Sequence, residues 1–342
     1  MYLLSFFTRM FHFLPSELSH FLALNGLKAA YSMGLLKLLI KYDLEKNDQI
    51  TNDSKNISSY YFKSYKNKLG IAAGLDKDGE FIDCLSALGV GFIEVGTVTP
   101  VKQIGNPKPR LFRNRKEKSL LNRLGFNNKG VEALVENLKK RKSTIPIGVS
   151  IGKNFDTPNE QAYEDYLICM EKVYQYSNYI AINISSPNTK DLRSLSNKEF
   201  LIDLLLKIKE KQNLLAKSFD YVPIFIKLSP DENQKALEEI CKCIIQYKID
   251  GIIATNTSID HNDKNGDGGL SGLPLKGKAT RNLSLIKKIV GNEVPIIASG
   301  GVMSASDYQE KINAGADLVQ VYTGFIFEGP KLIKDILKRE PA

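Results

Sequence analysis

From residue 69 onward, apolar and polar positions repeat one pattern along the chain. A short apolar run rich in β-branched residues is followed by a polar or glycine-rich turn, and then by a segment with helical periodicity. The runs are continuously apolar rather than alternating, which is typical of parallel strands buried on both faces. Eight such runs occur, at residues 69–74, 92–98, 147–152, 179–185, 223–229, 251–256, 295–300 and 318–324.

Eight strand–helix units in roughly 270 residues predict an α/β fold of the (β/α)₈ TIM-barrel type. The alternative is a doubly wound open sheet, but no GxGxxG fingerprint of a dinucleotide-binding fold follows the first run. In a barrel, the C-terminal ends of all strands face one mouth, where barrel enzymes carry their active sites. Candidate chemistry is therefore expected where these eight runs end.

Two connections in this region, residues 99–129 and 257–279, are too long to be simple turns. Long loops in a compact domain are usually lids, walls of a site, or disordered. The segment DHNDKNGDGG in the second connection is polar enough to form a mobile tip.

The N-terminal residues 1–45 follow a different pattern. The first 40 residues carry only four charged side chains, Arg9, Glu17, Lys28 and Lys37, and their apolar residues follow helical spacing, with GLLKLLIKY predicting a further short helix. The unit is too small for a core of its own, so it either caps the barrel or forms a membrane-surface hairpin. We therefore predict a helical segment over residues 1–45 and a catalytic barrel over residues 46–342.

Composition narrows the class of protein. The chain is 43% hydrophobic and 25% charged, which is ordinary for a globular protein. A net charge of +9 suits nucleic acid, an anionic membrane or an anionic substrate. Four cysteines without CxxC or Cys/His metal spacing predict reduced thiols and no metal site. No apolar run reaches the length of about 18 residues expected of a transmembrane helix.

The predicted mouth is rich in amides, hydroxyls and lysines (Lys77, Lys153 and Lys227), and poor in carboxylates. That composition disfavours a carboxylate-based hydrolase or a divalent-metal enzyme. The stretch NISSPNT, residues 183–189, places a serine pair after the fourth run. A nucleophilic serine normally needs a base such as histidine, yet the three histidines (His12, His20 and His261) lie elsewhere in the sequence.

Two glycine turns follow the seventh and eighth runs, SGGV with Gly300 and Gly301, and YTG at residues 322–324. Barrel enzymes often bind phosphate at these two strand ends, so the turns favour a phosphorylated cofactor or substrate. Lys227 within an apolar run either snorkels from a strand end or faces an electron-rich ring, as flavin sites require.

Four asparagines also lie at predicted strand-end or loop positions, Asn122, Asn183, Asn188 and Asn256. A single asparagine in a loop is usually a turn residue. Four converging amides suit a flat heterocycle with alternating C=O and N–H groups, and Lys77 could anchor its anionic group.

One ordered set of motifs runs along nearly the whole chain: AAGLDKDGE, GTVTP, GNPKPRLFR, NRLGFNNKG, NISSPNT, TNTS, GGLSGLPL, SGGV and LVQVYTGFIF. In this order they resemble the dihydroorotate dehydrogenase family, and more narrowly its class 2, the membrane-associated, quinone-dependent enzymes. The resemblance implies an FMN-dependent barrel that oxidises (S)-dihydroorotate to orotate in pyrimidine (UMP) biosynthesis. A membrane quinone would be the final electron acceptor.

Carried over residue by residue, the resemblance implies FMN contacts at Ala73, Gly74, Leu75, Asp76, Lys77, Thr97, Asn154, Asn183, Lys227, Thr255, Gly272, Gly301, Tyr322 and Thr323. It implies substrate contacts at Lys77, Asn122, Arg123, Leu124, Gly125, Phe126, Asn183, Asn188, Asn256 and Thr257.

In the same resemblance, Ser186 is the base that takes a proton from substrate C5 while hydride passes from C6 to flavin N5. Thr189 and Phe126 match positions of a hydrogen-bonded path that carries this proton onward. Class 1 enzymes have cysteine at the base position, and no cysteine falls in this loop, which supports class 2.

In class 2, two N-terminal helices form a tunnel through which quinone reaches the flavin. His20 and Arg113 match polar residues of that tunnel, although His20 could be an ordinary helix histidine and Arg113 a surface charge. Val101, Lys102 and Asn114 depart from the family pattern on the tunnel side. KLSPD at residues 227–231 is a separate departure, in place of the KIAPD that is usual in the family.

The resemblance further leads us to expect a peripheral protein on the cytoplasmic face of a bacterial inner membrane, because the chain begins almost directly at the tunnel helices. We expect a monomer that binds no nucleic acid. Two alternatives remain at this point. One is an FMN-dependent barrel acting on another pyrimidine, even one in RNA, and the other is a membrane-surface binding protein without enzymatic activity.

Overall fold

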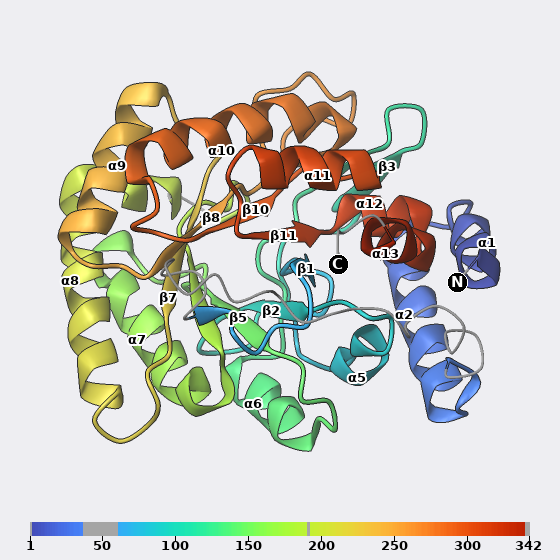
Figure 1. Cartoon of the computed structure of the whole chain (residues 1–342), viewed down its shortest axis with the longest axis horizontal. Coiled ribbons are helices and arrows are strands. Elements are labelled where there is room, and N and C mark those ends of the chain that lie inside the picture. The colour runs from blue at the N-terminus through green and yellow to red at the C-terminus, as the bar shows by residue number, and fades with distance from the viewer. Residues whose placement is uncertain (1, 37–60, 190–191, 339–342) are drawn as a thin grey trace.

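The computed structural model describes residues 2–36, 61–189 and 192–338. Its centre is a closed barrel of eight parallel strands, in the order β1-β2-β5-β6-β7-β8-β10-β11 (Figure 1). The strands are β1 (Leu69–Ile71), β2 (Phe92–Val98), β5 (Ile147–Ile151), β6 (Tyr179–Asn183), β7 (Ile224–Leu228), β8 (Gly251–Ala254), β10 (Ile296–Ser299) and β11 (Leu318–Val321). Each lies within one of the eight predicted runs, so the predicted TIM barrel is confirmed.

Every residue of these eight strands is buried, which explains why their sequences are apolar without alternation. Large rings fill the end of the barrel away from the mouth: Phe92, Tyr179 and Phe225 pack with Phe62 and Tyr65. Glycines on neighbouring strands make room for these rings. A Cβ atom on Gly148, for example, would lie 2.0 Å from the ring of Tyr179.

Helices surround the barrel (Figure 1). They are α5 (Ile82–Ser86), α6 (Val131–Lys140), α7 (Ala162–Val173), α8 (Lys198–Leu215), α9 (Gln234–Gln246), α10 (Lys276–Val290), α11 (Ala305–Asn313), α12 (Thr323–Glu328) and α13 (Pro330–Leu337), with short 3₁₀ turns η1 (Asn159–Gln161), η2 (Tyr174–Tyr176), η3 (Leu192–Ser196) and η4 (Leu273–Leu275). Their apolar faces cover the strands, as in α9, where Leu237, Ile240 and Ile244 are buried. The four cysteines are free and buried, as predicted.

The two long connections form a second, antiparallel sheet that was not predicted. Strand β4 (Ser119–Asn122) pairs with β3 (Leu111–Asn114) on one side and with β9 (Gly269–Gly272) on the other. The polar segment before β9 folds back on itself, since His261 Nε2 lies 3.0 Å from the Gly268 carbonyl oxygen. Within the described residues, the two connections are therefore ordered by strand pairing and hydrogen bonds rather than open loops.

Two N-terminal helices, α1 (Tyr2–Phe11) and α2 (Ser16–Ser32), lie outside the ring of barrel helices. Helix α1 lies beside α12 and α13, and α2 lies beside α5 and β3 (Figure 1). The Lys331 backbone amide donates to Ser5 Oγ at 2.9 Å, which attaches α1 to α13. Arg110 Nε lies 3.1 Å from Glu17 Oε1, which ties α2 to the segment before β3. The helix predicted for GLLKLLIKY lies mostly outside the described residues, and the division at residue 45 stays a prediction.

Candidate functional site

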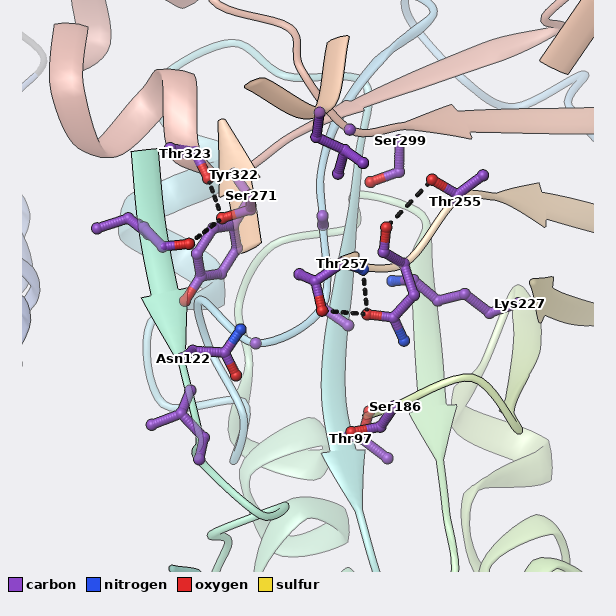
Figure 2. A pocket seen from close by; sticks show the side chains of 18 of the residues that line it. Thr97, Asn122, Ser186, Lys227, Thr255, Thr257, Ser271, Ser299, Tyr322 and Thr323 are labelled. Atoms are coloured by element: carbon purple, nitrogen blue, oxygen red, sulfur yellow. Dashed lines mark hydrogen bonds between the residues drawn. The ribbon is translucent and has the colours of Figure 1, made fainter. Parts of the chain in front are cut away.

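The barrel mouth and the β3-β4-β9 sheet together enclose a cavity (Figure 2). Among the residues singled out from the sequence, it is lined by Ala73, Gly74, Lys77, Thr97, Asn122, Leu124, Gly125, Phe126, Asn183, Ser186, Asn188, Lys227, Thr255, Asn256, Thr257, Gly272, Gly300, Gly301, Tyr322, Thr323 and Gly324. In Figure 2, Asn122 and Tyr322 approach from one side of this space and Lys227 and Thr257 from the other. Residues spread over most of the chain thus meet in one place.

The four asparagines lie in this cavity as two hydrogen-bonded pairs. Asn256 Nδ2 donates to Asn183 Oδ1 at 3.2 Å, and Asn188 Nδ2 donates to Asn122 Oδ1 at 2.8 Å. Asn183 Nδ2 in turn donates to Thr97 Oγ1 at 2.9 Å. These bonds hold four amides, from the ends of β4, β6 and β8 and the segments that follow them, in fixed orientations around a space that suits a flat, polar ring.

Ser186 lies in the cavity wall and is only 6% exposed. Its Oγ accepts a hydrogen bond from the Asn188 backbone N–H at 3.3 Å, and no histidine contacts it among the described residues. Close by in sequence, Thr189 Oγ1 is buried and has no hydrogen-bond partner in the described part of the chain. This arrangement is unlike a serine hydrolase, in which histidine activates the nucleophile.

Two lysines supply positive charge to the cavity. Lys77 Nζ donates a hydrogen bond to Asn127 Oδ1, and burial lowers the pKa of Lys77 to about 8. Lys227 Nζ lies 3.3 Å from Glu94 Oε1, deeper in the barrel. The third lysine expected at the mouth, Lys153, does not line the cavity, because its Nζ donates to the Thr157 carbonyl at 2.7 Å.

Glu94 is a residue that the sequence analysis missed. It is fully buried within β2, and its Oε2 accepts hydrogen bonds from Tyr179 Oη at 2.8 Å and from Gln320 Nε2 at 2.7 Å. The sequence did contain a signal for Glu94, because it is a carboxylate inside an otherwise apolar strand, and a buried charge requires a partner. Here the partner is Lys227, so Glu94 fixes the position of a cation that borders the cavity.

Glycines at the rim of the cavity let neighbouring backbone segments pack closely against each other. A Cβ atom on Gly301 (φ +76°) would lie 2.2 Å from Lys276 Cα, and one on Gly272 (φ +96°) would lie 2.3 Å from the Lys118 carbonyl oxygen. The hydroxyls of Ser271 and Thr323 lie 2.8 Å apart in the same region (Figure 2). The turns predicted to bind phosphate therefore border the cavity, with small and hydroxyl-bearing residues.

The residues present fit FMN. Gly301, Tyr322 and Thr323 form a glycine- and hydroxyl-lined end for a phosphate group. At the inner end, Gln320 is 1% exposed and its Oε1 has no hydrogen-bond partner among the described residues, although Gln320 lines the cavity. A buried acceptor without a donor is costly, and the imide N–H of a flavin is a donor of the required kind.

A second cavity of about 440 Å³ lies between α1, α2 and the barrel, and most of its lining is apolar. Leu111 and Leu120 line both cavities, so only their side chains and neighbouring residues separate the two spaces. His20 and Arg113, the two residues expected in a quinone tunnel, both line this second cavity. It is therefore a mostly apolar chamber directly beside the first cavity, and His20 and Arg113 are among its few polar side chains.

The surroundings of His20 set its protonation state, and those of Arg113 leave one N–H group available. Burial lowers the pKa of His20 to about 4, so its ring is neutral near pH 7. Arg113 donates from Nη1 to the His12 carbonyl at 3.1 Å, while its buried Nε has no partner in the described part of the chain. A neutral ring and an arginine N–H free to donate suit a neutral ligand that carries carbonyl oxygens.

Five predicted site residues do not line the main cavity: Leu75, Asp76, Arg123, Asn154 and Thr189. The Asn154 amide is used within the segment after β2, donating to the Val101 carbonyl at 2.9 Å. The Asp76 carboxylate accepts from the Glu80 and Phe81 amides at 2.9 and 2.8 Å, and burial raises its pKa to about 7. Their assigned roles stay predictions.

The outer surface of α1 and α2 is apolar. Phe13 and Phe21 are 76% and 61% exposed, and Met10, Leu18 and Met33 are exposed as well. Exposed apolar side chains gathered in one short segment are typical of surfaces that contact a membrane or another molecule. No helix among the described residues has the length and hydropathy needed to cross a membrane. Likewise, these residues contain no cluster of histidine, cysteine or acidic side chains that could hold a metal ion.

Comparison with known proteins gives a consistent result. A profile of the family described as "Dihydroorotate dehydrogenase" matches residues 58–340. The protein named dihydroorotate dehydrogenase (quinone) of Aliivibrio salmonicida is 54% identical over 280 residues, which cover 80% of this chain and 83% of that protein. The protein of the same name from Baumannia cicadellinicola is 53% identical over 283 residues, covering 80% and 84%.

Similarity extends to solved structures. The crystal structure of DHODH from Eimeria tenella in complex with ferulenol has a TM-score of 0.79 and 32% sequence identity. The match covers 91% of this chain and 89% of the Eimeria chain. The ligand-free form of the same enzyme gives a TM-score of 0.78.

Proposed function

The chain belongs to the dihydroorotate dehydrogenase family, in its quinone-dependent class 2, and from this premise we propose that it oxidises dihydroorotate to orotate with FMN and a membrane quinone. The observation that carries the proposal is the pair of adjoining cavities. One is polar and lined by amides, lysines and Ser186, and the other is apolar, with Leu111 and Leu120 shared between them. Such an arrangement suits a two-electron transfer between a polar and an apolar substrate.

In this proposal the substrate ring is held by Asn122, Asn183, Asn188 and Asn256, whose amides can match its alternating C=O and N–H groups. Lys77 holds the substrate carboxylate by a charge-assisted hydrogen bond. Fixing the ring by several directional bonds keeps it in one reactive orientation, which accounts for a large part of the rate enhancement in reactions of this kind.

FMN, when bound, would accept the hydride from dihydroorotate and pass the two electrons on to the quinone. Gly301, Tyr322 and Thr323 would hold its phosphate, while Thr97, Lys227, Thr255 and Gln320 would surround its ring. Lys227 provides a positive charge that Glu94 keeps in position, 3.3 Å away. An ammonium fixed beforehand stabilises negative charge that develops nearby without reorganising during the reaction.

Ser186 is proposed to take the proton from substrate C5. A serine hydroxyl is a weak base, so the proton must pass onward as it is taken. In this proposal the Thr189 hydroxyl, whose Oγ1 has no partner among the described residues, receives it, and Phe126 lines the same cavity as Ser186. Exclusion of water by buried residues strengthens each of these interactions.

Quinone is proposed to enter the apolar cavity from the membrane, along α1 and α2. Arg113 Nε, which has no partner among the described residues, can donate to one of its carbonyl oxygens, and the neutral ring of His20 lines the same cavity. The exposed Phe13 and Phe21 would insert into the bilayer interface, which makes the association peripheral. In this proposal the enzyme is a monomer on the cytoplasmic face of the bacterial inner membrane.

The test is the substrate specificity of the purified enzyme. Dihydroorotate should drive quinone reduction with one orotate formed for each quinone reduced. Dihydrouracil, which lacks the carboxylate that Lys77 binds, should be a far poorer substrate. Faster turnover of dihydrouracil than of dihydroorotate would instead favour a flavin barrel that acts on another pyrimidine.

A further inference from the structure

Arg193, in the 3₁₀ turn η3 that follows the Ser186 loop, has no role in the function proposed so far. Its guanidinium group makes three separate contacts. Nε donates to the Ser185 carbonyl at 3.2 Å, Nη2 donates to the Thr257 carbonyl at 2.9 Å, and Nη1 lies 2.8 Å from Asp231 Oδ2. One side chain thus joins the segments that follow three consecutive barrel strands, β6, β7 and β8.

Asp231 extends this connection. Its carboxylate also accepts from Ser258 Oγ at 2.5 Å and from the Ile259 amide at 2.8 Å, and it lies 2.6 Å from Lys278 Nζ. Burial opposes its ionisation, but its hydrogen bonds, that from Lys278 first, lower the pKa of Asp231 to about 2. The carboxylate is therefore ionised throughout the physiological range, and the ion pair with Arg193 does not depend on pH there.

The atoms that Arg193 contacts are adjacent to the reacting groups. Ser185 directly precedes Ser186. Thr257 directly follows Asn256, whose side-chain amide donates a hydrogen bond to Asn183 Oδ1. The side chains of Arg193 and Asp231 are 20% and 14% exposed, so neither ion is simply a solvated surface charge. A planar guanidinium that donates to two backbone carbonyls and a carboxylate constrains all three in position and orientation, which an ammonium group cannot do.

We propose that Arg193, anchored by Asp231, is a positioning residue that holds the Ser186 loop against the Asn256–Thr257 segment, so that base and substrate ring meet at the correct distance. This inference rests on the proposed function, since it concerns the same site. Without Arg193 the loop that carries Ser186 would lose its attachment to the wall that carries the substrate. Proton removal from C5 would then become slower, while the flavin end of the cavity, which Arg193 does not contact, would be unaffected.

The experiment measures anaerobic bleaching of the bound flavin by saturating dihydroorotate in Arg193→Ala. The rate should fall about 100-fold, the typical cost of a displacement near 1 Å between reacting groups. The deuterium isotope effect for dihydroorotate labelled at C5 should increase, because proton removal becomes limiting. FMN content and the rate of flavin reoxidation by quinone should match the wild type, and added guanidinium ion should restore part of the lost rate.

Two further variants keep the test decisive. Lys278→Met removes the other cation on Asp231 without touching the Ser185 or Thr257 carbonyls, so its bleaching rate should stay close to the wild-type rate. Arg193→Lys keeps the charge but not the fork of donors, and should be slower than wild type by about tenfold. If Arg193→Ala does not fold, the bleaching rate of Arg193→Lys tests the positioning role instead.

The positioning role would be overturned if Arg193→Ala bleached at the wild-type rate with the wild-type isotope effect. If only Arg193→Lys folds, the same result in that variant would overturn it. A loss in Lys278→Met as large as that in Arg193→Ala would also overturn it, since the effect would then arise from charge around Asp231. The wild-type enzyme serves as the reference for the underlying function. If dihydroorotate fails to bleach its flavin, the proposed function itself is wrong, and the role of Arg193 in it falls too.

Discussion

Ser186 is the residue on which the proposed chemistry depends most. In Ser186→Ala the C5 proton has no acceptor at its usual place, while the cavity keeps its shape because only one hydroxyl is removed. Flavin bleaching by dihydroorotate should slow by about 10²- to 10⁴-fold, the usual contribution of a positioned base, with FMN still bound. Stopped-flow absorbance across pH measures this rate. A variant as fast as the wild type at every pH would exclude Ser186 as the base.

Lys77 makes substrate binding depend on pH. Its pKa of about 8 means that the ammonium is charged below this pH and loses its charge as the pH rises through it. Orotate, an anion, should therefore bind most tightly below about pH 8, and its Kd should rise by up to about tenfold for each pH unit above. Flavin absorbance changes on titration with orotate give the Kd. In Lys77→Met the binding should be weaker and this pH dependence should vanish, whereas a flat wild-type profile would argue against the assigned role.

Glu94 and Lys227 form a buried ion pair whose loss should affect stability as well as chemistry. Glu94→Gln leaves the Lys227 ammonium buried without its counter-charge, which typically costs about 3–5 kcal/mol. Urea unfolding of the FMN-saturated enzyme measures this difference. Glu171→Gln breaks the surface pair with Lys211 and is the matched control, with an expected loss below about 1 kcal/mol. Equal losses in the two variants would mean that the buried pair contributes no more than an exposed one.

Residues at the strand ends could be predicted from the sequence because the barrel topology brings every strand end to one mouth. Glu94 and Arg193 could not be assigned in this way. The partners of Glu94 are 85, 133 and 226 residues away along the chain, and those of Arg193 are up to 64 residues away. Their pairing depends on side-chain packing between neighbouring strands and loops, which a periodic pattern does not encode.

Among the elements, the barrel strands were predictable because burial on both faces leaves a continuous apolar run. The β3-β4-β9 sheet was missed since β3 is only partly buried and the sequences LFRN, SLLN and GLSG mix polar and glycine residues with apolar ones. Neither alternation nor a continuous apolar run develops in them. Helices α1 and α2 were predicted by spacing, but spacing could not show which elements they contact. The structure adds that they enclose an apolar cavity that shares Leu111 and Leu120 with the polar one.

Deleting residues 1–45 tests the role of these helices. The deletion removes one wall of the apolar cavity and the exposed Phe13 and Phe21, so quinone turnover and vesicle binding should both be lost. FMN should stay bound, and dihydroorotate should still bleach it, because the described residues that line the polar cavity lie outside the deleted segment. Turnover assays with quinone and sedimentation with vesicles measure the two losses.

The double variant Phe13→Ser, Phe21→Ser is the matched control for this deletion. Neither phenylalanine lines the apolar cavity, so turnover with a short, soluble quinone should persist while vesicle binding weakens. If the enzyme that lacks residues 1–45 keeps normal quinone turnover, α1 and α2 do not form the route by which quinone reaches the flavin.

For the whole molecule, the central claim is that one flavin, bound in the polar cavity beside the apolar one, connects dihydroorotate oxidation to quinone reduction. The most direct measurement follows the flavin absorbance of the purified enzyme without oxygen, with dihydroorotate added first and quinone second. We predict that the yellow colour is lost on the first addition, with one orotate formed for each flavin, and that it returns on the second. A colourless protein that binds no FMN, or a flavin that dihydroorotate leaves oxidised, would contradict the account.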